Sequence, residues 1–306
     1  MLSFVLEVIN QGLAYGVLAI AVTLTYKILD FPDLSVDGSF PLGSVIAAVV
    51  LLRWGSIPLA LLLAYVGGLA AGLLTGFLHV KLKISNLLSG ILVMTGLYSI
   101  NLMIANNRSN LPIFNVRTMF TVGSWVDTLP TDMQMWVARF YPTIILLIVI
   151  ILLKVAMDWF LETKLGFLLR ITGDNPQLVI ALGEDIGKTK ILGLMLSNGI
   201  AAFSGAIAMQ MFRFYDISLG SGIVVVGLAS VVLGTSVLGF MKSWKITTLV
   251  VFGSILYRLS ISVALALKLP PSNLKLITAV IFVLALVLNN KELKPKFMKG
   301  RGIKNA

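Results

Sequence analysis

Long runs of apolar residues leave this chain few possible folds. A helix of about 20 apolar residues crosses the hydrocarbon core of a bilayer. Eight runs of about that length lie near residues 4–26, 58–80, 85–105, 140–160, 190–210, 222–241, 246–267 and 274–289, and a shorter run lies near 39–52. The chain is 58% apolar and 12% charged, whereas roughly 25% of the residues in a soluble domain are charged. The sequence therefore predicts an all-α polytopic membrane protein, a single transmembrane domain over residues 1–306 with about eight to ten spanning or partly spanning helices.

Composition also excludes several kinds of chemistry. The chain has no Cys and a single His, His79, so it has neither thiolates nor the His cluster that a metal centre or a catalytic triad needs. Its net charge of +11 comes from 24 Lys and Arg against 13 Asp and Glu. Basic residues beside apolar runs commonly set membrane topology. We therefore expect lipid rather than nucleic acid as the partner of this charge, and no metal or cofactor in the chain.

Lys and Arg residues are distributed unevenly between the two faces of the predicted bundle. If the basic tail, residues 290–306, is cytoplasmic and there are nine crossings, sixteen Lys and Arg lie on the cytoplasmic side and seven on the outer side. Positively charged loops favour the cytoplasm. The sequence predicts a cell-membrane protein with its N-terminus outside and its C-terminus in the cytoplasm. The two longest connections, 106–139 and 161–189, then lie on opposite faces.

The segment 31–40, which reads FPDLSVDGSF, interrupts the apolar pattern with a proline and a glycine. Its polar residues are Asp33, Ser35, Asp37 and Ser39. Irregular backbone at membrane depth is tolerated where it is buried in protein or lines a cavity. Two interpretations stay open: a broken or re-entrant helix that lines a transport pathway, or a plain turn at the cytoplasmic face. Asn101 and Asn198, inside predicted spans, are candidates for the same pathway or for hydrogen bonds between helices.

Arg258 lies about halfway along the predicted span 246–267. A charge at the centre of a spanning helix costs about 2.5–3.5 kcal/mol on insertion scales, so it needs a partner or a water-filled cavity. The acidic candidates are Asp37, Asp33 and Glu7. We expect either a structural ion pair or a direct role in solute contact or gating.

The stretch 161–189 is too polar to span a membrane and too apolar to be a simple tether. Leucines precede Arg170, breakers follow at 173–176, and a second apolar stretch runs to Gly183. Asp174 or Asn175 can cap the second helix, with Pro176 at its first position, where the missing N–H costs nothing. The pattern predicts two short amphipathic helices with an apolar ridge that another protein receives. A loop that lies on lipid headgroups is the alternative.

Three segments resemble ABC importer permeases of the branched-chain amino acid type. The run TKLGFLLRITGDNPQLVIALGEDIGK resembles their cytoplasmic coupling segment, LAYGVLAIAVTLTYKILDFPDLSVDGSFPLG their first helix and the element after it, and GSGIVVVGLASVVLG a late glycine-rich helix. The LSVDGSF, LYRLS and LPPSNLKLITA stretches are more similar to an offshoot associated with aromatic amino acids and other solutes. Branched-chain permeases tend to read Asn-Phe-Ala-His-Gly where this chain has Leu-Ser-Val-Asp-Gly at 34–38, which leaves the solute open.

This resemblance implies a permease subunit with a type II-like architecture and several partners. Two permease copies, as a homodimer, would form the pathway, two cytoplasmic ATPases would bind ATP and Mg, and an extracytoplasmic binding protein would deliver an amino acid or related solute. Carried over by position, the coupling residues are Arg170, Gly173, Asp174, Asn175, Pro176 and Gly183. Arg170 is a candidate to pair with an acidic ATPase residue.

The sequence agrees with a division of labour between subunits. It contains no G-x-x-x-x-G-K-[ST] motif, so it lacks the loop that cradles nucleotide phosphates in many ATPases. A self-contained secondary transporter is the main alternative, but such carriers commonly show internal repeats, and none is visible in this sequence. An intramembrane enzyme would need convergent acids, a metal cluster or an activated nucleophile, and the chain is therefore not expected to be an enzyme.

Overall fold

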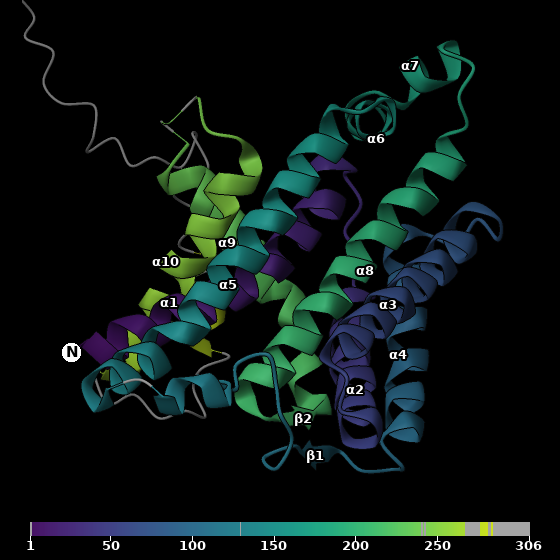
Figure 1. Ribbon diagram of the computed structural model, residues 1–306. Coiled ribbons are helices and arrows are strands. Elements are labelled where there is room, and N and C mark those ends of the chain that lie inside the picture. Colours follow the sequence, from purple (N-terminus) through teal and green to yellow (C-terminus); the bar gives the residue numbers. More distant parts are fainter. Residues whose placement is uncertain are drawn as a thin grey trace, which may run out of the picture.

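The computed structural model describes residues 2–128, 130–239, 241, 243–266, 276–280 and 283. Within these residues, eight helical stretches are long and apolar enough to cross a membrane (Figure 1). They are α1 (Leu2–Thr23) with a π-helical extension (Leu24–Ile28), α2 (Val36–Trp54), α3 (Ile57–Val80), α4 (Asn86–Ile104), α5 (Thr131–Glu162), α8 (Ile186–Phe212), α9 (Ile223–Val237) with the 3₁₀ turn before it (Ile217–Gly220), and α10 (Ile246–Ala266). The predicted all-α polytopic fold is confirmed.

Eight of the nine predicted apolar segments correspond to these spans. The ninth, 274–289, lies mostly outside the described residues, although 276–280 are helical. The basic tail, 290–306, also lies outside them.

The second apolar segment forms a longer helix than its sequence suggested. α2 runs unbroken through Pro41, so the irregular backbone lies before α2, in residues 29–35, and not within the span. Pro41 has no N–H to donate to the carbonyl of Asp37 four residues earlier. Gly220 packs directly against that carbonyl, where a Cβ atom would overlap it.

α5 begins about nine residues earlier than predicted, because its first turns carry polar residues that hydropathy assigns to a loop. Its 32 residues extend about 48 Å at ~1.5 Å per residue. That length exceeds the ~30 Å hydrocarbon core, so α5 must tilt or project beyond the membrane.

Glycines bring α2, α3 and α8 into backbone contact. Gly68 and Gly72 of α3 face the carbonyl oxygens of Asn198 and Leu194 so closely that a Cβ atom at either position would overlap them. Gly43 of α2 lies against Ala202 of α8 in the same way. The repeat of Gly68, Gly72 and Gly76 therefore serves helix packing, as expected for small residues in membrane helices.

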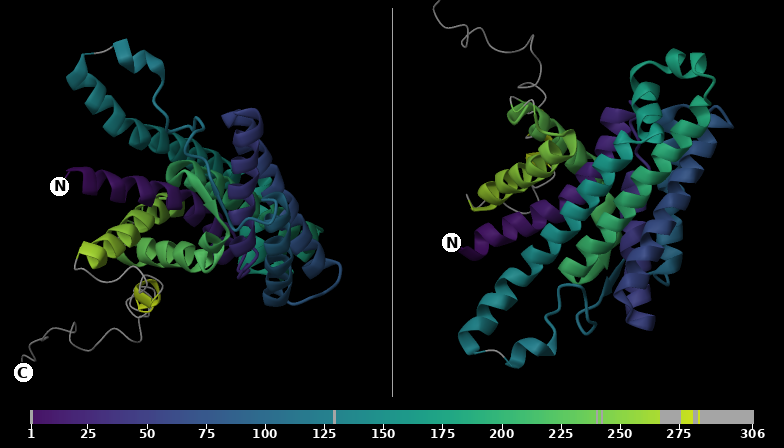
Figure 2. Two further views of the ribbon diagram at one scale, coloured as in Figure 1. Left: turned by 90° about the horizontal axis from the view of Figure 1, so that it is seen from below. Right: turned by 45° about the horizontal axis from the view of Figure 1, so that its top comes forward.

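The two ends of the bundle differ in structure. At one end, which we call the strand end, β1 (Asn110–Pro112) pairs antiparallel with β2 (Phe214–Asp216), with Leu111 opposite Tyr215. The helices α6 (Lys164–Asp174) and α7 (Pro176–Ala181) lie at the opposite end, which we call the coupling end (Figure 1). Figure 2 shows α2, α3 and α4 gathered on one side of the molecule and α10 on the other. α8 and α1 pack between these groups.

Candidate functional site

The segment 161–189 folds into a helix, a turn and a second helix. The Thr163 side chain caps α6 by accepting a hydrogen bond from the backbone N–H of Gly166. Pro176 takes the first position of α7, and Asn175 takes the cap position without a side-chain capping bond. Gly183 ends the motif with φ of +75°, a conformation that favours glycine. The breaker residues thus define the local structure that the sequence predicted.

α6 and α7 each have some apolar side chains that are buried and others that are exposed. Leu168, Leu169 and Val179 are buried. Large apolar side chains that remain exposed are Leu165, Phe167, Leu178, Ile180 and Leu182, which we call the α6–α7 apolar surface. Phe167 and Ile180 belong to this surface although the sequence pattern did not single them out.

α6 is fixed to the end of α1. Gly173 packs against the carbonyl oxygen of Ile28, and a Cβ atom at this position would overlap it. Leu169 lies beside Leu29 at Gly193 of α8. A movement of α6 therefore presses directly on the backbone that links α1 to α2.

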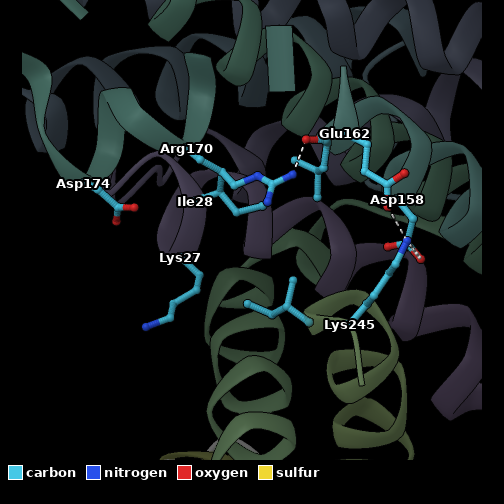
Figure 3. Close-up of a pocket in the computed structure, with 9 residues that line it drawn as sticks. Lys27, Ile28, Asp158, Glu162, Arg170, Asp174 and Lys245 are labelled. Atoms are coloured by element: carbon cyan, nitrogen blue, oxygen red, sulfur yellow. Dashed lines mark hydrogen bonds and ion pairs between the residues drawn. The ribbon is translucent and has the colours of Figure 1, made fainter. Parts of the chain in front are cut away.

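A cavity of about 360 Å³ is lined by residues of α6 and of the ends of α1, α5 and α10 (Figure 3). Its charged lining residues are Lys27, Asp158, Glu162, Arg170, Asp174 and Lys245. Arg170 points into this cavity and donates a hydrogen bond to the carbonyl of Leu161 in the last turn of α5 (Figure 3). This contact satisfies a carbonyl that has no partner within its own helix. Arg170 is still exposed and its guanidinium has further donors, so its pairing with an acidic ATPase residue stays a prediction.

Ion pairs join the end of α5 to the start of α10 beside this cavity. Lys245 Nζ lies 2.7 Å from Glu162 and 3.9 Å from Asp158, which is also 2.8 Å from Lys154. Thr247 donates a 2.6 Å hydrogen bond to Asp158. The bond to Glu162 raises the pKa of Lys245. We call Lys154, Asp158, Glu162 and Lys245 the α5–α10 ion-pair cluster.

Two polar residues of the irregular stretch before α2, Asp33 and Ser35, are buried and hydrogen-bonded. Asp33 Oδ1 accepts bonds from the backbone N–H of Ser35 at 2.8 Å and from its hydroxyl at 2.6 Å. Asp33 Oδ2 accepts a 2.8 Å bond from Asn198, whose own Oδ1 accepts a 2.5 Å bond from Ser39. All four side chains are buried. We call them the Asp33–Asn198 network.

This network lies inside the bundle and not at its surface. Asn198 follows Ile186, the first residue of α8, by twelve positions, or about 18 Å along the helix. Asp33 and Ser35, which bond to Asn198, therefore lie within the protein, the setting in which irregular backbone at membrane depth is tolerated, whereas Asp30 and Pro32 of the same stretch are exposed. The structure joins Asp33, Ser35, Ser39 and Asn198 into one unit, and places Asp37 and Asn101 elsewhere.

Asp37 and Asn101 line a second cavity, of about 610 Å³, which we call the α2–α4 cavity. Its walls come from α2 (Asp37, Gly38, Pro41), α4 (Met94, Thr95, Tyr98, Ser99, Asn101) and the turn before α9 (Ile217, Ser218, Ser221). Asp37 accepts hydrogen bonds from the backbone N–H groups of Gly222 at 2.9 Å and Val224 at 2.8 Å. Asn101 donates to the carbonyl of Gly38 at 3.2 Å.

Arg258 does not form the expected ion pair. Within the described part of the chain, neither Asp33, Asp37, Glu7 nor another carboxylate pairs with it. Its guanidinium carbon lies 4.7 Å from the ring centroid of Tyr15, and Tyr15 stacks on Phe40 at 6.3 Å. A guanidinium over an aromatic face is attracted by the ring quadrupole. The predicted carboxylate partner is therefore wrong, and an aromatic ring takes its place.

A family model described as "Branched-chain amino acid transport system / permease component" matches residues 4–286. The chain belongs to this permease family. The permease is 40% identical over 295 residues to a tyrosine transport system permease protein of Clostridioides difficile, covering 96% of this chain and 94% of that protein. It is 29% identical to an uncharacterised protein of Rickettsia prowazekii, over 93% of this chain and 97% of the relative.

A more distant relative is an autoinducer 2 import system permease protein of Salmonella typhimurium, 26% identical over 66% of this chain and 54% of that protein. No solved structure matches the permease. Family and relatives together make the chain a permease subunit of an ABC importer for small solutes, and not a catalytic enzyme. Among the described residues, no group of three or more His, Asp or Glu side chains is placed to hold a metal ion.

Proposed function

We infer that the permease imports an amino acid, with an aromatic amino acid such as tyrosine as the first solute to test. The observation that carries this proposal is the 40% identity to a tyrosine permease protein over nearly the whole of both chains. An aromatic amino acid also suits a pathway that contains both a carboxylate and aromatic side chains, since Asp37 and Tyr98 line the α2–α4 cavity.

The ATPase transmits the conformational changes of ATP hydrolysis to the permease through the α6–α7 apolar surface. Five large apolar side chains exposed at one end of the molecule are costly in water, and they lie on a segment that contacts α1, α5 and α8. Cytoplasmic ABC ATPases, which bind ATP and Mg, cover this surface. Gly173 and Gly183 shape the segment, Arg170 fixes it to α5, and Asp174, Asn175 and Pro176 form its exposed turn.

Orientation follows from this assignment. The coupling end faces the cytoplasm of a prokaryotic cell, the C-terminus lies on the same side, and the N-terminus lies outside. The strand end meets an extracytoplasmic binding protein. Two copies of the permease, as a homodimer, enclose the pathway, to which Asp37 and Asn101 contribute directly. The Asp33–Asn198 network and Arg258 hold the helices that line it.

Reconstitution tests the proposal. Proteoliposomes that contain permease, ATPase and binding protein should accumulate labelled L-tyrosine only when ATP is present on the ATPase side. Liposomes with the permease alone should not accumulate it. Uptake driven by a proton or sodium gradient without the ATPase would replace this proposal with a secondary transporter.

Cysteine labelling tests the coupling surface and the topology together. The chain has no native Cys, so single cysteines at Asn175 and Gly183 should react from the cytoplasmic side and cross-link to the ATPase. A single cysteine at Phe114, a position that is 62% exposed near the strand end, is the matched control and should react only from outside. The reverse labelling pattern would overturn the orientation.

A further inference from the structure

The α2–α4 cavity has a polar wall where a membrane helix would normally be apolar. Thr95, Tyr98 and Ser99 of α4 are exposed along it. Polar side chains in a span are costly against lipid and ordinarily face protein or water. This face of α4 therefore looks into an aqueous or protein-enclosed space.

Asp37 presents a fixed carboxylate to this cavity. Its two oxygens each accept one backbone N–H at the start of α9, from Gly222 and Val224. Each carboxylate oxygen keeps capacity for a further donor. Among the described Lys, Arg and His residues, none forms an ion pair with Asp37.

Asn101 presents a second acceptor, and this one has no donor. The side chain is fully buried, its amide nitrogen donates to Gly38, and its Oδ1 has no hydrogen-bond partner. A buried carbonyl without a donor costs about 1–3 kcal/mol. Less than 1 Å² of this oxygen is exposed, so a donor from the cavity removes this cost once the wall around Asn101 shifts to admit it.

We propose that Asp37 and Asn101 form a recognition site for the ammonium group of the transported solute in the α2–α4 cavity. The two side chains lie on α2 and α4 and are joined through Gly38, since Asn101 donates to the carbonyl of the residue after Asp37. An ammonium group carries three donors and a positive charge. It can donate to Asp37 and, once that oxygen is exposed, to the open acceptor of Asn101.

The same cavity gives no matching charge to a carboxylate. Its lining contains no Lys, Arg or His, while Tyr98 and Met94 offer apolar area to a ring. The site therefore recognises the amine end of an amino acid. An analogue that keeps the amine and lacks the carboxylate should bind better than one that keeps the carboxylate and lacks the amine. This inference rests on the proposed function, because it names the solute class that the same pathway accepts.

Direct binding tests the site. The permease–ATPase complex in nanodiscs, without binding protein, is titrated with labelled L-tyrosine, and tyramine and 3-(4-hydroxyphenyl)propanoate are used as competitors. Tyramine should compete and the propanoate should not. Asn101→Leu should weaken tyrosine binding by about 10- to 100-fold, the loss of one hydrogen bond to a charged group. Asn101→Asp, which keeps an acceptor and adds charge, should bind tyrosine at least as tightly as the wild type, so the two variants bracket the wild type.

A matched control separates binding from folding. Ser89→Ala removes a buried hydroxyl on the same helix that bonds only its own backbone, and it should leave both tyrosine binding and thermal stability unchanged. Unchanged tyrosine binding in Asn101→Leu, or equal competition by the propanoate, would overturn the ammonium site. ATP- and binding-protein-dependent uptake by the wild type, measured in parallel, reports on the proposed function separately. Absence of this uptake would contradict the proposed function whatever the binding result.

Discussion

At the scale of single residues, two ionisable side chains inside the permease, Asp33 and Arg258, have different kinds of partner. Asp33 is held by hydroxyl, amide and backbone donors within its own network. Arg258 is held over an aromatic ring. In neither case does a described residue of opposite charge form the partner, so simple charge matching between spans does not describe this core.

Removing Asn198 should destabilise the Asp33–Asn198 network. Asn198→Leu leaves Asp33 Oδ2 and the Ser39 hydroxyl without their present partners, at an expected cost of about 2–4 kcal/mol in the free energy of unfolding. Ser44→Ala, which removes a hydroxyl bonded only to backbone carbonyls, is the control and should cost about 1 kcal/mol or less. Thermal unfolding in detergent measures both. Equal losses in the two variants would show that the network contributes nothing beyond ordinary hydrogen bonds.

The contact between Arg258 and Tyr15 should appear as a coupling energy. A double-mutant cycle of Arg258→Leu and Tyr15→Leu should give about 1–2 kcal/mol, read from thermal stability. Tyr15→Phe keeps the ring and should retain most of it. The cycle of Arg258→Leu with Asp37→Asn should be additive, because these side chains have different partners. Strong coupling to Asp37 instead would restore the ion-pair interpretation.

At the scale of elements, close helix approach depends on a few positions without side chains. Gly72 faces backbone atoms of α8 that cannot move without displacing the helix, whereas Gly96 of α4 has open space around it. The two glycines lie in similar membrane helices and differ only in what surrounds them.

Alanine substitutions at these two glycines should have opposite effects. Gly72→Ala should force α3 and α8 apart and cost about 1–3 kcal/mol, while Gly96→Ala should be neutral or stabilising by up to ~1 kcal/mol through helix propensity. The yield of folded protein and its thermal midpoint give the comparison. A Gly72→Ala protein as stable as Gly96→Ala would mean that the two helices are free to separate.

The α5–α10 ion-pair cluster should affect transport more than folding. Asp158→Asn weakens the attraction to Lys154 and Lys245 at the coupling end without changing side-chain size. We expect ATP hydrolysis by the complex to continue and L-tyrosine uptake per ATP to fall. Asp127→Asn, in the 3₁₀ turn Ser124–Thr128 of the long connection, is the control for a lost acidic charge. A fall in hydrolysis and uptake by the same factor would argue against a role in coupling.

At the scale of the whole molecule, assembly with the ATPase should depend on the α6–α7 apolar surface. Replacing Phe167 and Ile180 by Ser removes two of its large exposed side chains and should abolish co-purification of the ATPase, while membrane insertion and thermal stability stay unchanged. Gln177→Ser, a polar change on the same short helix, should have no effect. Retention of the ATPase by the double variant would exclude this surface as the main contact.

Hydropathy alone located all eight described spans, because burial in lipid acts on each apolar run separately. It could not locate the first turns of α5, which are polar although helical. The Asp33–Asn198 network joins residues 165 positions apart, and no local pattern encodes such a pairing. The breakers at 173–176 predicted the turn of the coupling segment, but the bond from Arg170 to the Leu161 carbonyl depends on α5, which the pattern does not contain.

α9 lies between the α2–α4 cavity and the chain that leads to the α5–α10 ion-pair cluster. Its first turn holds the carboxylate of Asp37 in the α2–α4 cavity, and the chain beyond its last turn leads to Lys245 of the α5–α10 ion-pair cluster. A 15-residue helix behaves as a stiff rod of about 22 Å. If this helix couples events at its two ends, the coupling is reciprocal. If nucleotide bound to the ATPase lowers the affinity of the cavity for solute by some factor, solute in the cavity must lower the affinity for that nucleotide by the same factor.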